Sequence, residues 1–422
     1  MKAEIISVGT ELLLGQTVDT NAAHIARSLA ELGFSVYRKT TVGDNRARLA
    51  SAVREALERA DVVVTTGGLG PTEDDLTRET VAEVLGVRLV ENPEVLAYIK
   101  GYFTSRGARM TENNTKQALV PGYGAGSYFP NTMGTAPGLT FEAGDKRVIC
   151  LPGVPREMIY LMETHVEPYL RAYLTRSGAR EAIVSRIIRT VGIGEAALEE
   201  RIFDLSHDQA NPTVAIYAEA GECQIRVTAS AEEEAEAWRL IDSVEREIRT
   251  RLGSVVYGYD ADTLEVVVAR RLAAAGASLA VTESCTGGLI CGLLTDVAGS
   301  SVFLERGIVA YSNSAKRDEL SVRGSTLDAH GAVSRETAIE MACGVVRKAD
   351  ANLGLSVTGI AGPSGGSPDK PVGLVYFGLA DAKKVSVISA RMRFGGDRRF
   401  VRMRASKFGL DLLRRRLEDA WA

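Results

Sequence analysis

Short apolar runs alternate with amphipathic helical stretches in two separate parts of the chain, and this alternation limits the possible folds more than any other feature. In residues 1–170, apolar runs of strand length are separated by stretches with helical periodicity. The expected strands are Ile5–Val8, Ser35–Val42, Val62–Thr65 and Val148–Leu151, and the expected helices lie near residues 20–32, 46–59, 75–85, 93–105 and 155–170. Alternation at this spacing is typical of a parallel, doubly wound sheet. We therefore predict an α/β domain over residues 1–170.

The pattern changes in residues 175–253 and then returns. The middle segment predicts a small α+β unit in the order strand, helix, strand, strand, helix. Its expected elements are Ile183–Val191, Glu195–Leu205, Val214–Glu219, Cys223–Ala229 and Glu232–Leu252. From residue 258, strands near 278–282, 307–311, 353–358, 372–379 and 385–392 alternate with helices and predict a second α/β domain, 258–422. Because no low-complexity linker separates the units, we expect them to pack together.

Composition excludes several classes of protein. Of the 422 residues, 45% are hydrophobic and 25% are charged, which is typical of a globular protein rather than a disordered one. With 50 basic and 54 acidic residues, the chain has no global field that would draw it to nucleic acid or anionic lipid. Its five cysteines form no CxxC pair, and no uncharged apolar run approaches the roughly 18 residues of a membrane helix. We expect a cytoplasmic protein without a signal peptide or membrane span.

The first domain carries a glycine-rich turn followed by acids, Thr65-Thr66-Gly67-Gly68-Leu69-Gly70-Pro71-Thr72-Glu73-Asp74-Asp75. Glycines allow a ligand to approach the backbone closely, and the following helix offers unpaired N–H groups to an anion. Carboxylates beside a phosphate site are explained by a hard cation such as Mg²⁺, which takes ligands from both. The alternative is a tight turn whose acids cap the helix.

This segment resembles the GGxGxxxxDxT motif of the molybdopterin-binding fold of MogA and MoaB. Two further segments agree, Gly9-Thr10-Glu11-Leu12-Leu13-Leu14-Gly15 with Asp19-Thr20-Asn21, and Leu151-Pro152-Gly153-Val154-Pro155-Arg156-Glu157-Met158. Together they resemble the CinA (competence/damage-inducible) family more closely than the stand-alone cofactor enzymes. The resemblance implies a three-layer α/β molybdopterin-binding-like domain.

It also implies metal-dependent hydrolysis of ADP-ribose to AMP and ribose 5-phosphate. A divalent ion (Mg²⁺, Mn²⁺ or Co²⁺) would clamp the pyrophosphate and generate hydroxide. By this resemblance Asp75 is assigned as metal ligand, and Asp74, Glu11 and Asp19 are further candidates. The substrate-binding residues that we assign to this site are Gly9, Glu11, Asp19, Asn21, Gly67, Gly68, Gly70 and Thr72.

In the last domain, Thr282-Glu283-Ser284-Cys285-Thr286-Gly287-Gly288 lies between an expected strand and an apolar helix. A hydroxyl on such a turn is exposed, and backbone N–H groups at the helix start can stabilise an oxyanion. Downstream, Gly299-Ser300-Ser301 and Tyr311-Ser312-Asn313-Ser314-Ala315-Lys316 add hydroxyls and an amine. Ser, Tyr and Lys without a nearby His indicate a serine activated by lysine, although serines at turns commonly cap helices.

These segments, with His330-Gly331-Ala332-Val333-Ser334 and the glycine-rich stretch 358–366, resemble the CinA C-terminal domain. That resemblance implies nicotinamide mononucleotide deamidase activity without a cofactor. Ser284 is then the first choice of nucleophile and Ser301 its rival or an oxyanion donor, with Lys316 as base and Tyr311 as orienting or relay group. Cys285 is expected to be a packing residue. The substrate is expected to be bound by Thr286, Gly287, Gly288, Gly359, Ala361, Gly362 and Arg398.

The middle unit resembles the KH-like insert of the same family. An RNA-binding KH domain carries a basic GxxG loop, but this chain has Val191-Gly192-Ile193-Gly194-Glu195, which argues against nucleic-acid binding. Homodimerisation is implied by the family alone. We predict a two-site nucleotide hydrolase acting on nicotinamide mononucleotide and ADP-ribose. The alternatives are a molybdopterin adenylyltransferase-like enzyme and a DNA-associated competence or recombination factor.

Overall fold

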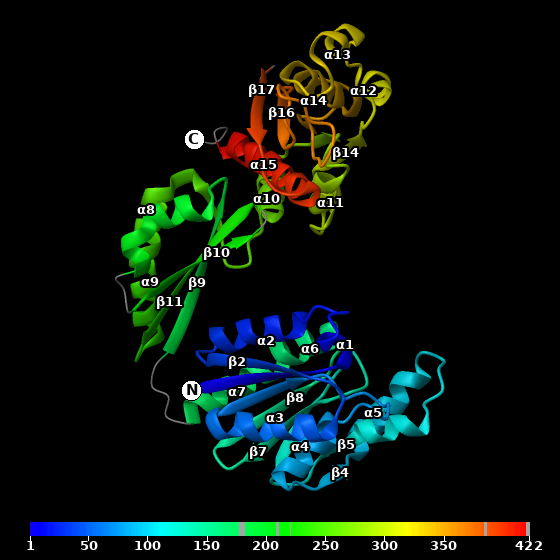
Figure 1. Cartoon of the computed structure of the whole chain (residues 1–422), viewed down its shortest axis with the longest axis vertical. Helices are drawn as coiled ribbons and strands as arrows, with labels where there is room; N and C mark the ends of the chain where they lie inside the picture. The colour runs from blue at the N-terminus through cyan, green and yellow to red at the C-terminus, as the bar shows by residue number, and fades with distance from the viewer. Residues whose placement is uncertain (177–181, 208–210, 220, 384–385, 419–422) are drawn as a thin grey trace. The chain divides into compact units, whose positions relative to one another are not determined.

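The computed structural model describes residues 1–176, 182–207, 211–219, 221–383 and 386–418. The chain divides into two compact units, and each is described by itself (Figure 1). The first contains Met1–Val184 and Ser230–Ala237, and the second contains Ser185–Ala229 and Trp238–Ala422. The middle segment and the last domain therefore belong largely to one unit.

The first unit is built on a six-stranded sheet in the order β2-β1-β3-β8-β7-β6. The first four strands in this order are parallel, as the sequence predicts, whereas β7 is antiparallel to both of its neighbours, β8 and β6. The four strands predicted from the sequence are thus parallel, and the sheet as a whole is mixed because a tight turn through Gly144 (φ 61°) joins β7 directly to β8 and leaves no room for a crossover helix. The strands are β1 (Lys2–Val8), β2 (Ser35–Val42), β3 (Val62–Thr66), β6 (Gly126–Phe129), β7 (Gly138–Ala143) and β8 (Lys146–Leu151).

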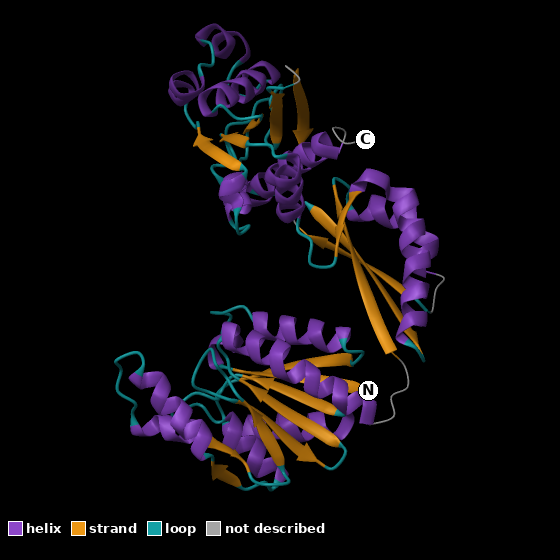
Figure 2. Ribbon diagram, turned by 180° about the vertical axis from the view of Figure 1, so that it is seen from behind, coloured by secondary structure: helices purple, strands orange, loops and turns teal. Residues whose placement is uncertain are grey.

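Helices cover both faces of this sheet and produce the predicted three-layer arrangement (Figure 2). Val62 and Val64 of β3 face one core and Val63 faces the other, because successive side chains of a strand point to opposite faces. On one face pack α2 (Thr20–Glu31), α6 (Pro155–Leu161), the π-helical turn Met162–Val166 and α7 (Glu167–Arg176). On the other pack α3 (Arg46–Arg59), α4 (Thr77–Leu85) and α5 (Pro93–Thr104), and the remaining elements are α1 (Thr10–Leu13), the 3₁₀ segment Glu112–Ala118, β4 (Leu89–Glu91) and β5 (Leu119–Pro121).

The second unit begins with the predicted strand–helix–strand–strand–helix order. Its four-stranded sheet has the order β10-β11-β9-β12, and two helices lie along one face of it in Figure 2. Ile241, Val244 and Ile248 line the buried side of the longer helix at helical spacing. The elements are β9 (Ala182–Val191), α8 (Glu195–His207), β10 (Thr213–Glu219), β11 (Glu222–Ala231), α9 (Glu234–Leu252), the 3₁₀ turn Gly253–Val255 and β12 (Val256–Tyr259).

The remainder of this unit forms a five-stranded sheet in the order β14-β13-β15-β16-β17. The first three strands are parallel, and β16 is antiparallel to both of its neighbours, β15 and β17, so this sheet is also mixed. The strands are β13 (Leu279–Glu283), β14 (Leu304–Val309), β15 (Leu353–Gly359), β16 (Leu374–Asp381) and β17 (Ser386–Arg393). Around them lie α10 (Leu264–Ala275), α11 (Leu289–Thr295), the 3₁₀ turn Ser300–Val302, α12 (Asn313–Leu320), α13 (Gly324–His330), α14 (Arg335–Ala349) and α15 (Arg398–Glu418).

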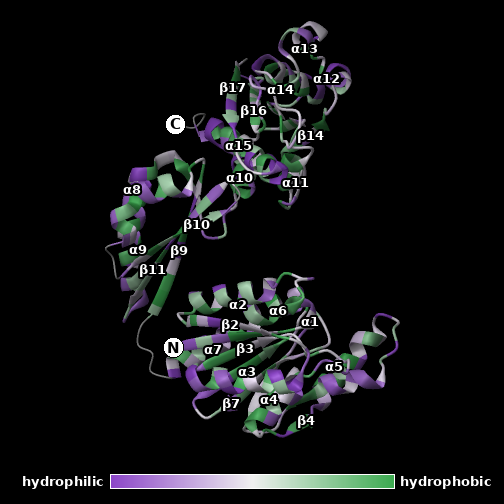
Figure 3. Cartoon of the chain, in the orientation of Figure 1, coloured by the Kyte–Doolittle hydropathy of each residue, from purple (hydrophilic) through white to green (hydrophobic). Residues whose placement is uncertain are grey.

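Surface helices such as α2 and α3 show both hydrophilic and hydrophobic residues along their length in Figure 3. This is expected of helices that bury one face against a sheet. Among the described residues, no helix combines the length and the apolar character needed to cross a bilayer.

Candidate active sites

Ser284 lies in the turn that joins β13 to α11, at the carboxyl end of a parallel strand. Its backbone N–H donates a 2.9 Å hydrogen bond to the Val357 carbonyl of the neighbouring strand β15. The preceding residue, Glu283, is fully buried, and its carboxylate accepts hydrogen bonds from the N–H groups of Gly288 (3.0 Å), Ile290 (3.2 Å) and Cys291 (2.9 Å). The turn is thus anchored at both sides.

Lys316 brings an amine to this turn from the separate helix α12. Its Nζ lies 3.1 Å from Ser284 Oγ, and it also donates to the carbonyls of Ala310 (2.9 Å) and Tyr311 (3.1 Å). The side chain is 1% exposed, and burial lowers the pKa of the Lys316 amine. A lowered pKa favours the neutral amine, which can accept the proton of a serine hydroxyl.

The side chains of Ser301 and Tyr311, the other two predicted catalytic residues, do not contact the Lys316 amine in the described hydrogen bonds. The described hydrogen bonds of Lys316 go to Ser284, Ala310 and Tyr311, and none goes to Ser301, which lies exposed in the turn before β14. The Tyr311 ring is 60% exposed, and its hydroxyl accepts a 3.0 Å hydrogen bond from Arg398. Tyr311 therefore orients Lys316 through its backbone carbonyl, while its side chain contacts Arg398.

The sequence predicts that N–H groups at the start of α11 stabilise an oxyanion. The N–H groups of Gly288, Ile290 and Cys291 are not available for this role, because they already donate to the Glu283 carboxylate.

The residues after Ser284 complete the turn. Cys285 is buried, and burial raises the pKa of its thiol to about 12, so this group is poorly suited to form a thiolate. Thr286 is fully buried and its carbonyl accepts from the Arg402 guanidinium at 2.7 Å. Gly287 (φ 62°) and Gly288 (φ 93°) adopt the left-handed conformation that lets the turn enter the helix.

The glycine-rich stretch after β15 lies beside the same site. Gly362 (φ 81°) accepts a 2.8 Å hydrogen bond from Arg398 through its carbonyl, and Ala361 is buried. A Cβ atom at Gly359 would lie 2.7 Å from the Leu374 carbonyl, so this position requires glycine. Arg398 therefore links the glycine-rich stretch to Tyr311, and two of its five donors are used in doing so.

In the first unit, the predicted glycine turn borders a cavity of about 410 Å³. Gly67, Gly68 and Gly70 line it together with Gly9 and Asp75. Gly67 could not be replaced by another residue, because its φ of 101° is left-handed and a Cβ there would collide with the Val8 backbone carbonyl, whereas a Cβ at Gly70 would meet only the end of the Asp75 side chain. The cavity lies at the carboxyl ends of β1, β3 and β8, where α/β sheets place ligands.

The acids of this turn are held by local hydrogen bonds. Asp75 accepts from the Thr72 N–H (2.9 Å), and the Thr72 hydroxyl lies within hydrogen-bonding distance of both carboxylates and can donate its one proton to either Asp75 (2.6 Å) or Asp74. The hydrogen bond from the Thr72 hydroxyl lowers the pKa of Asp74. Lys116 donates to the Thr72 and Asp75 carbonyls, so it fixes the turn rather than projecting its charge into solvent. Thr72 itself does not line the cavity, and its role is to hold the Asp74 and Asp75 carboxylates by hydrogen bonds.

Glu11 lines the cavity, but Asp19 and Asn21 do not. Asp19 caps α2 by accepting from Ala22 N–H (2.8 Å) and also accepts from the Ser7 hydroxyl (2.6 Å). Asn21 is buried and donates to the Thr66 hydroxyl and the Gly153 carbonyl, both at 2.9 Å. Both residues connect the strand ends that form the cavity, so the structure gives them positioning roles.

Three acids at these sites were not predicted from the sequence. Asp44 lines the first cavity and accepts from the Thr10 N–H (2.9 Å) and hydroxyl (2.8 Å). Glu157 lines it as well and accepts from Asn131 at 2.6 Å, and burial raises the pKa of its carboxyl. The third is Glu283. The sequence signal available for two of them was their place in the motifs: Glu157 lies four residues after Pro152-Gly153, and Glu283 directly precedes Ser284-Cys285.

Within the described ranges, no three His, Cys, Asp or Glu side chains are arranged to hold a metal ion unaided. Asp74 and Asp75 nevertheless fit a hard cation that completes its coordination with substrate phosphates and water, because each carboxylate offers lone pairs beyond those used by Thr72.

Comparison with known proteins agrees with the three-domain layout predicted from the sequence. Three family models match it, described as probable molybdopterin binding domain (residues 4–172), damage-inducible protein CinA KH domain (185–258) and CinA C-terminal domain (261–417). CinA-like proteins of Kosmotoga olearia and Dictyoglomus thermophilum are each 47% identical to it, over 99% of this chain and 99% of their own length. A crystal structure described as the protein CinA with unknown function from Thermoplasma acidophilum is 41% identical, covers 40% of this chain and 96% of that chain, and has a TM-score of 0.37. Full-length identity of this degree, with all three domain models in order, shows that the chain belongs to the CinA family.

Proposed function

We propose that the second unit hydrolyses the amide of nicotinamide mononucleotide to give nicotinate mononucleotide and ammonia. The observation that carries this proposal is the 3.1 Å contact between the buried Lys316 amine and the Ser284 hydroxyl. A buried amine with a lowered pKa, held by two carbonyls and aimed at a serine on a strand-end turn, is the arrangement of a serine–lysine nucleophile.

The reaction then takes place in two halves. Neutral Lys316 accepts the hydroxyl proton as Ser284 Oγ bonds to the amide carbon, and the protonated amine returns that proton to the leaving nitrogen as the C–N bond breaks. Ammonia departs and an ester links the nicotinoyl group to Ser284. Water, deprotonated by Lys316, attacks the ester carbon and releases the acid. Because Lys316 is an acceptor in each attack and a donor in each departure, one residue serves both halves.

Arg398 and the glycine-rich stretch are suited to the phosphate of this substrate. The guanidinium retains donors beyond the two that contact Gly362 and Tyr311. A charged, forked donor beside a glycine turn binds a phosphate by paired hydrogen bonds. We therefore assign Arg398 to phosphate binding and the Tyr311 side chain to holding Arg398 in place.

For the first unit we propose metal-dependent hydrolysis of ADP-ribose to AMP and ribose 5-phosphate. The supporting observation is the cavity that joins Gly67, Gly68 and Gly70 to the carboxylates of Asp74 and Asp75. Asp74 and Asp75 would hold the divalent ion, which when bound supplies charge neutralisation of the pyrophosphate and an activated water. The glycines admit the phosphates close to the backbone, and Thr72 and Lys116 fix the acids.

Both activities are tested by assaying the full chain with each substrate. We expect ammonia from nicotinamide mononucleotide and, with a divalent metal, AMP from ADP-ribose. Ser284→Ala should remove only the first activity and Asp75→Asn only the second. Adenylyl transfer to a pterin in place of ADP-ribose hydrolysis would favour the alternative molybdopterin-type enzyme, and loss of both activities in one variant would contradict two independent sites.

A further inference from the structure

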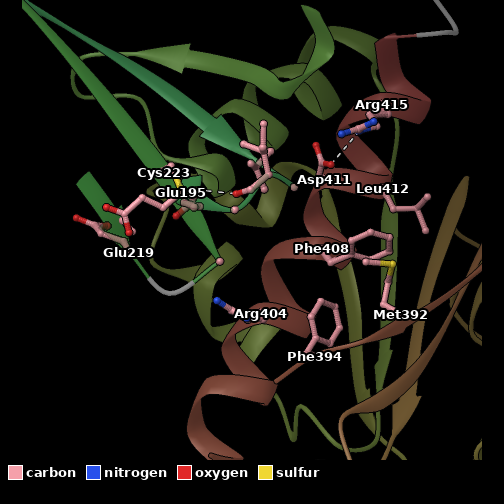
Figure 4. A pocket seen from close by; sticks show the side chains of 17 residues that line it. Glu195, Glu219, Cys223, Met392, Phe394, Arg404, Phe408, Asp411, Leu412 and Arg415 are labelled. Carbon is pink, nitrogen blue, oxygen red and sulfur yellow. Dashed lines mark hydrogen bonds and ion pairs between the residues drawn. The ribbon is translucent and has the colours of Figure 1, made fainter. Parts of the chain in front are cut away.

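The second unit contains a cavity of about 570 Å³ that is separate from the Ser284 site. It lies between the loop that joins β9 to α8, the ends of β10 and β11, the end of β17 and the helix α15. Figure 4 shows its apolar wall, formed by Met392, Phe394, Phe408 and Leu412. This volume falls in the range of small-molecule sites.

One basic residue of this cavity is not neutralised. Arg404 is half-buried and stands over the Phe400 ring at 4.7 Å, and within the described residues it makes no ion pair with a carboxylate. Its neighbours on α15 differ, because Lys407 pairs with Glu222 (3.0 Å) and Glu265 (2.9 Å), and Arg415 pairs with Asp411 (2.8 Å). Arg404 is therefore the cation available to a ligand.

Two glutamates, Glu195 and Glu219, lie on the side opposite the apolar wall in Figure 4. Both are exposed at the mouth of the cavity. Glu195, Arg404 and the buried Cys223 thiol all line this cavity. The cavity therefore presents side chains of both charge signs.

Glycines form part of the cavity lining. Gly192 (φ 79°) and Gly221 (φ 95°) both adopt the left-handed conformation. A Cβ atom at Gly192 would lie 3.5 Å from the Arg415 guanidinium, and one at Gly221 would lie 3.4 Å from Arg404 Cα. These are ordinary van der Waals distances, so it is the left-handed backbone that favours glycine at both positions.

These charges restrict the ligand. A phosphate dianion would gain Arg404 but would be repelled by Glu195 and Glu219, and a purely apolar molecule would leave Arg404 desolvated without a partner. A zwitterion with an apolar body satisfies all three elements. We propose that this cavity binds a free α-amino acid with an aromatic or branched apolar side chain. Its carboxylate would meet Arg404, its ammonium would meet the glutamates, and its side chain would cover the apolar wall.

Isothermal titration of the full chain with L-phenylalanine tests this proposal. We expect one molecule to bind per chain, with a dissociation constant in the millimolar range or below. 3-Phenylpropanoate lacks the ammonium and phenethylamine lacks the carboxylate, so each should bind about 10-fold or more weakly, since a charged hydrogen bond is lost. Equal binding of either analogue, or no binding of L-phenylalanine and L-leucine, would overturn the proposal.

Variants locate the binding. Arg404→Gln and Glu195→Gln should each weaken L-phenylalanine about 10-fold or more, whereas Arg399→Gln, an exposed arginine on the same helix outside the cavity, should not. Ala218→Trp fills the cavity from an exposed position on β10 without changing charge, so it should abolish binding even if Arg404→Gln impairs folding. Unchanged affinity in Ala218→Trp, with its thermal unfolding as a folding check, would refute the site.

Discussion

Replacing Glu283 by glutamine removes the charge that ties the first turn of α11 to the end of β13. The carboxylate accepts hydrogen bonds from Gly288 (3.0 Å), Ile290 (3.2 Å) and Cys291 (2.9 Å) and is fully buried. An amide has one acceptor oxygen, and its NH₂ group cannot accept, so at least one backbone N–H loses its partner. A hydrogen bond to a charged group contributes about 1.5–3 kcal/mol, and we expect a local loss of about 2 kcal/mol.

Amide hydrogen exchange measures this loss at the affected turn and avoids treating a chain of several domains as a single two-state unit. A local loss of about 2 kcal/mol corresponds to about 30-fold faster exchange of the Gly288, Ile290 and Cys291 amides. Deamidation should fall as well, because Ser284 directly follows Glu283 in the turn that these hydrogen bonds hold. The matched control is Asp296→Asn, which removes an exposed carboxylate at the opposite end of α11 and should leave these amides unchanged.

Exchange in Glu283→Gln at the rate of the unsubstituted chain would refute the reasoning, since the three bonds would then contribute nothing to the turn. Faster exchange with unchanged deamidation would show instead that the turn is held by Glu283 but that Ser284 does not depend on it.

Three further predictions follow from the two sites. Cys285→Ala should retain most deamidation, because burial holds the pKa of this thiol at about 12, and a large loss of rate at unchanged thermal stability would indicate a thiol mechanism instead. Asp75→Asn should reduce the rate of metal-dependent AMP formation by at least about 100-fold and leave the rate of ammonia release unchanged, when one preparation is assayed with both substrates. Because burial lowers the pKa of Lys316 and the neutral amine is the base, deamidation should rise as the pH increases through a pKa below the ordinary lysine value, and a rate that falls over this interval would contradict the assignment.

Much of the fold follows from the sequence because its strands are apolar and its helices amphipathic. The elements that escaped prediction lack these signals. The helix α12 has the sequence Asn-Ser-Ala-Lys-Arg-Asp-Glu-Leu, which is nearly all polar, although it buries Lys316 and Leu320. The antiparallel ends of both sheets depend on turn geometry, as at Gly144, and strand direction is not encoded in hydrophobic periodicity.

The two sites show the same contrast between what the sequence predicts and what only the packing determines. Motifs placed Ser284 and Lys316 in one domain, but the 3.1 Å contact between them depends on how α12 packs against the end of β13. Likewise, Asp19 and Asn21 belong to a quoted motif, yet the structure uses them to join strand ends because their partners Ser7, Thr66 and Gly153 are distant in sequence. Spacing along the chain indicates which residues share a site and does not indicate which atoms they engage.

The most direct test of the central assignment is ammonia release from nicotinamide mononucleotide by the full chain and by three single variants. Ser284→Ala and Lys316→Met should each lose the activity, because one supplies the nucleophile and the other its base, while Ser301→Ala should retain most of it. Loss in Ser301→Ala with activity preserved in Ser284→Ala would reverse the assignment of the nucleophile. Failure of the unsubstituted chain to release ammonia would contradict the proposed deamidase function itself.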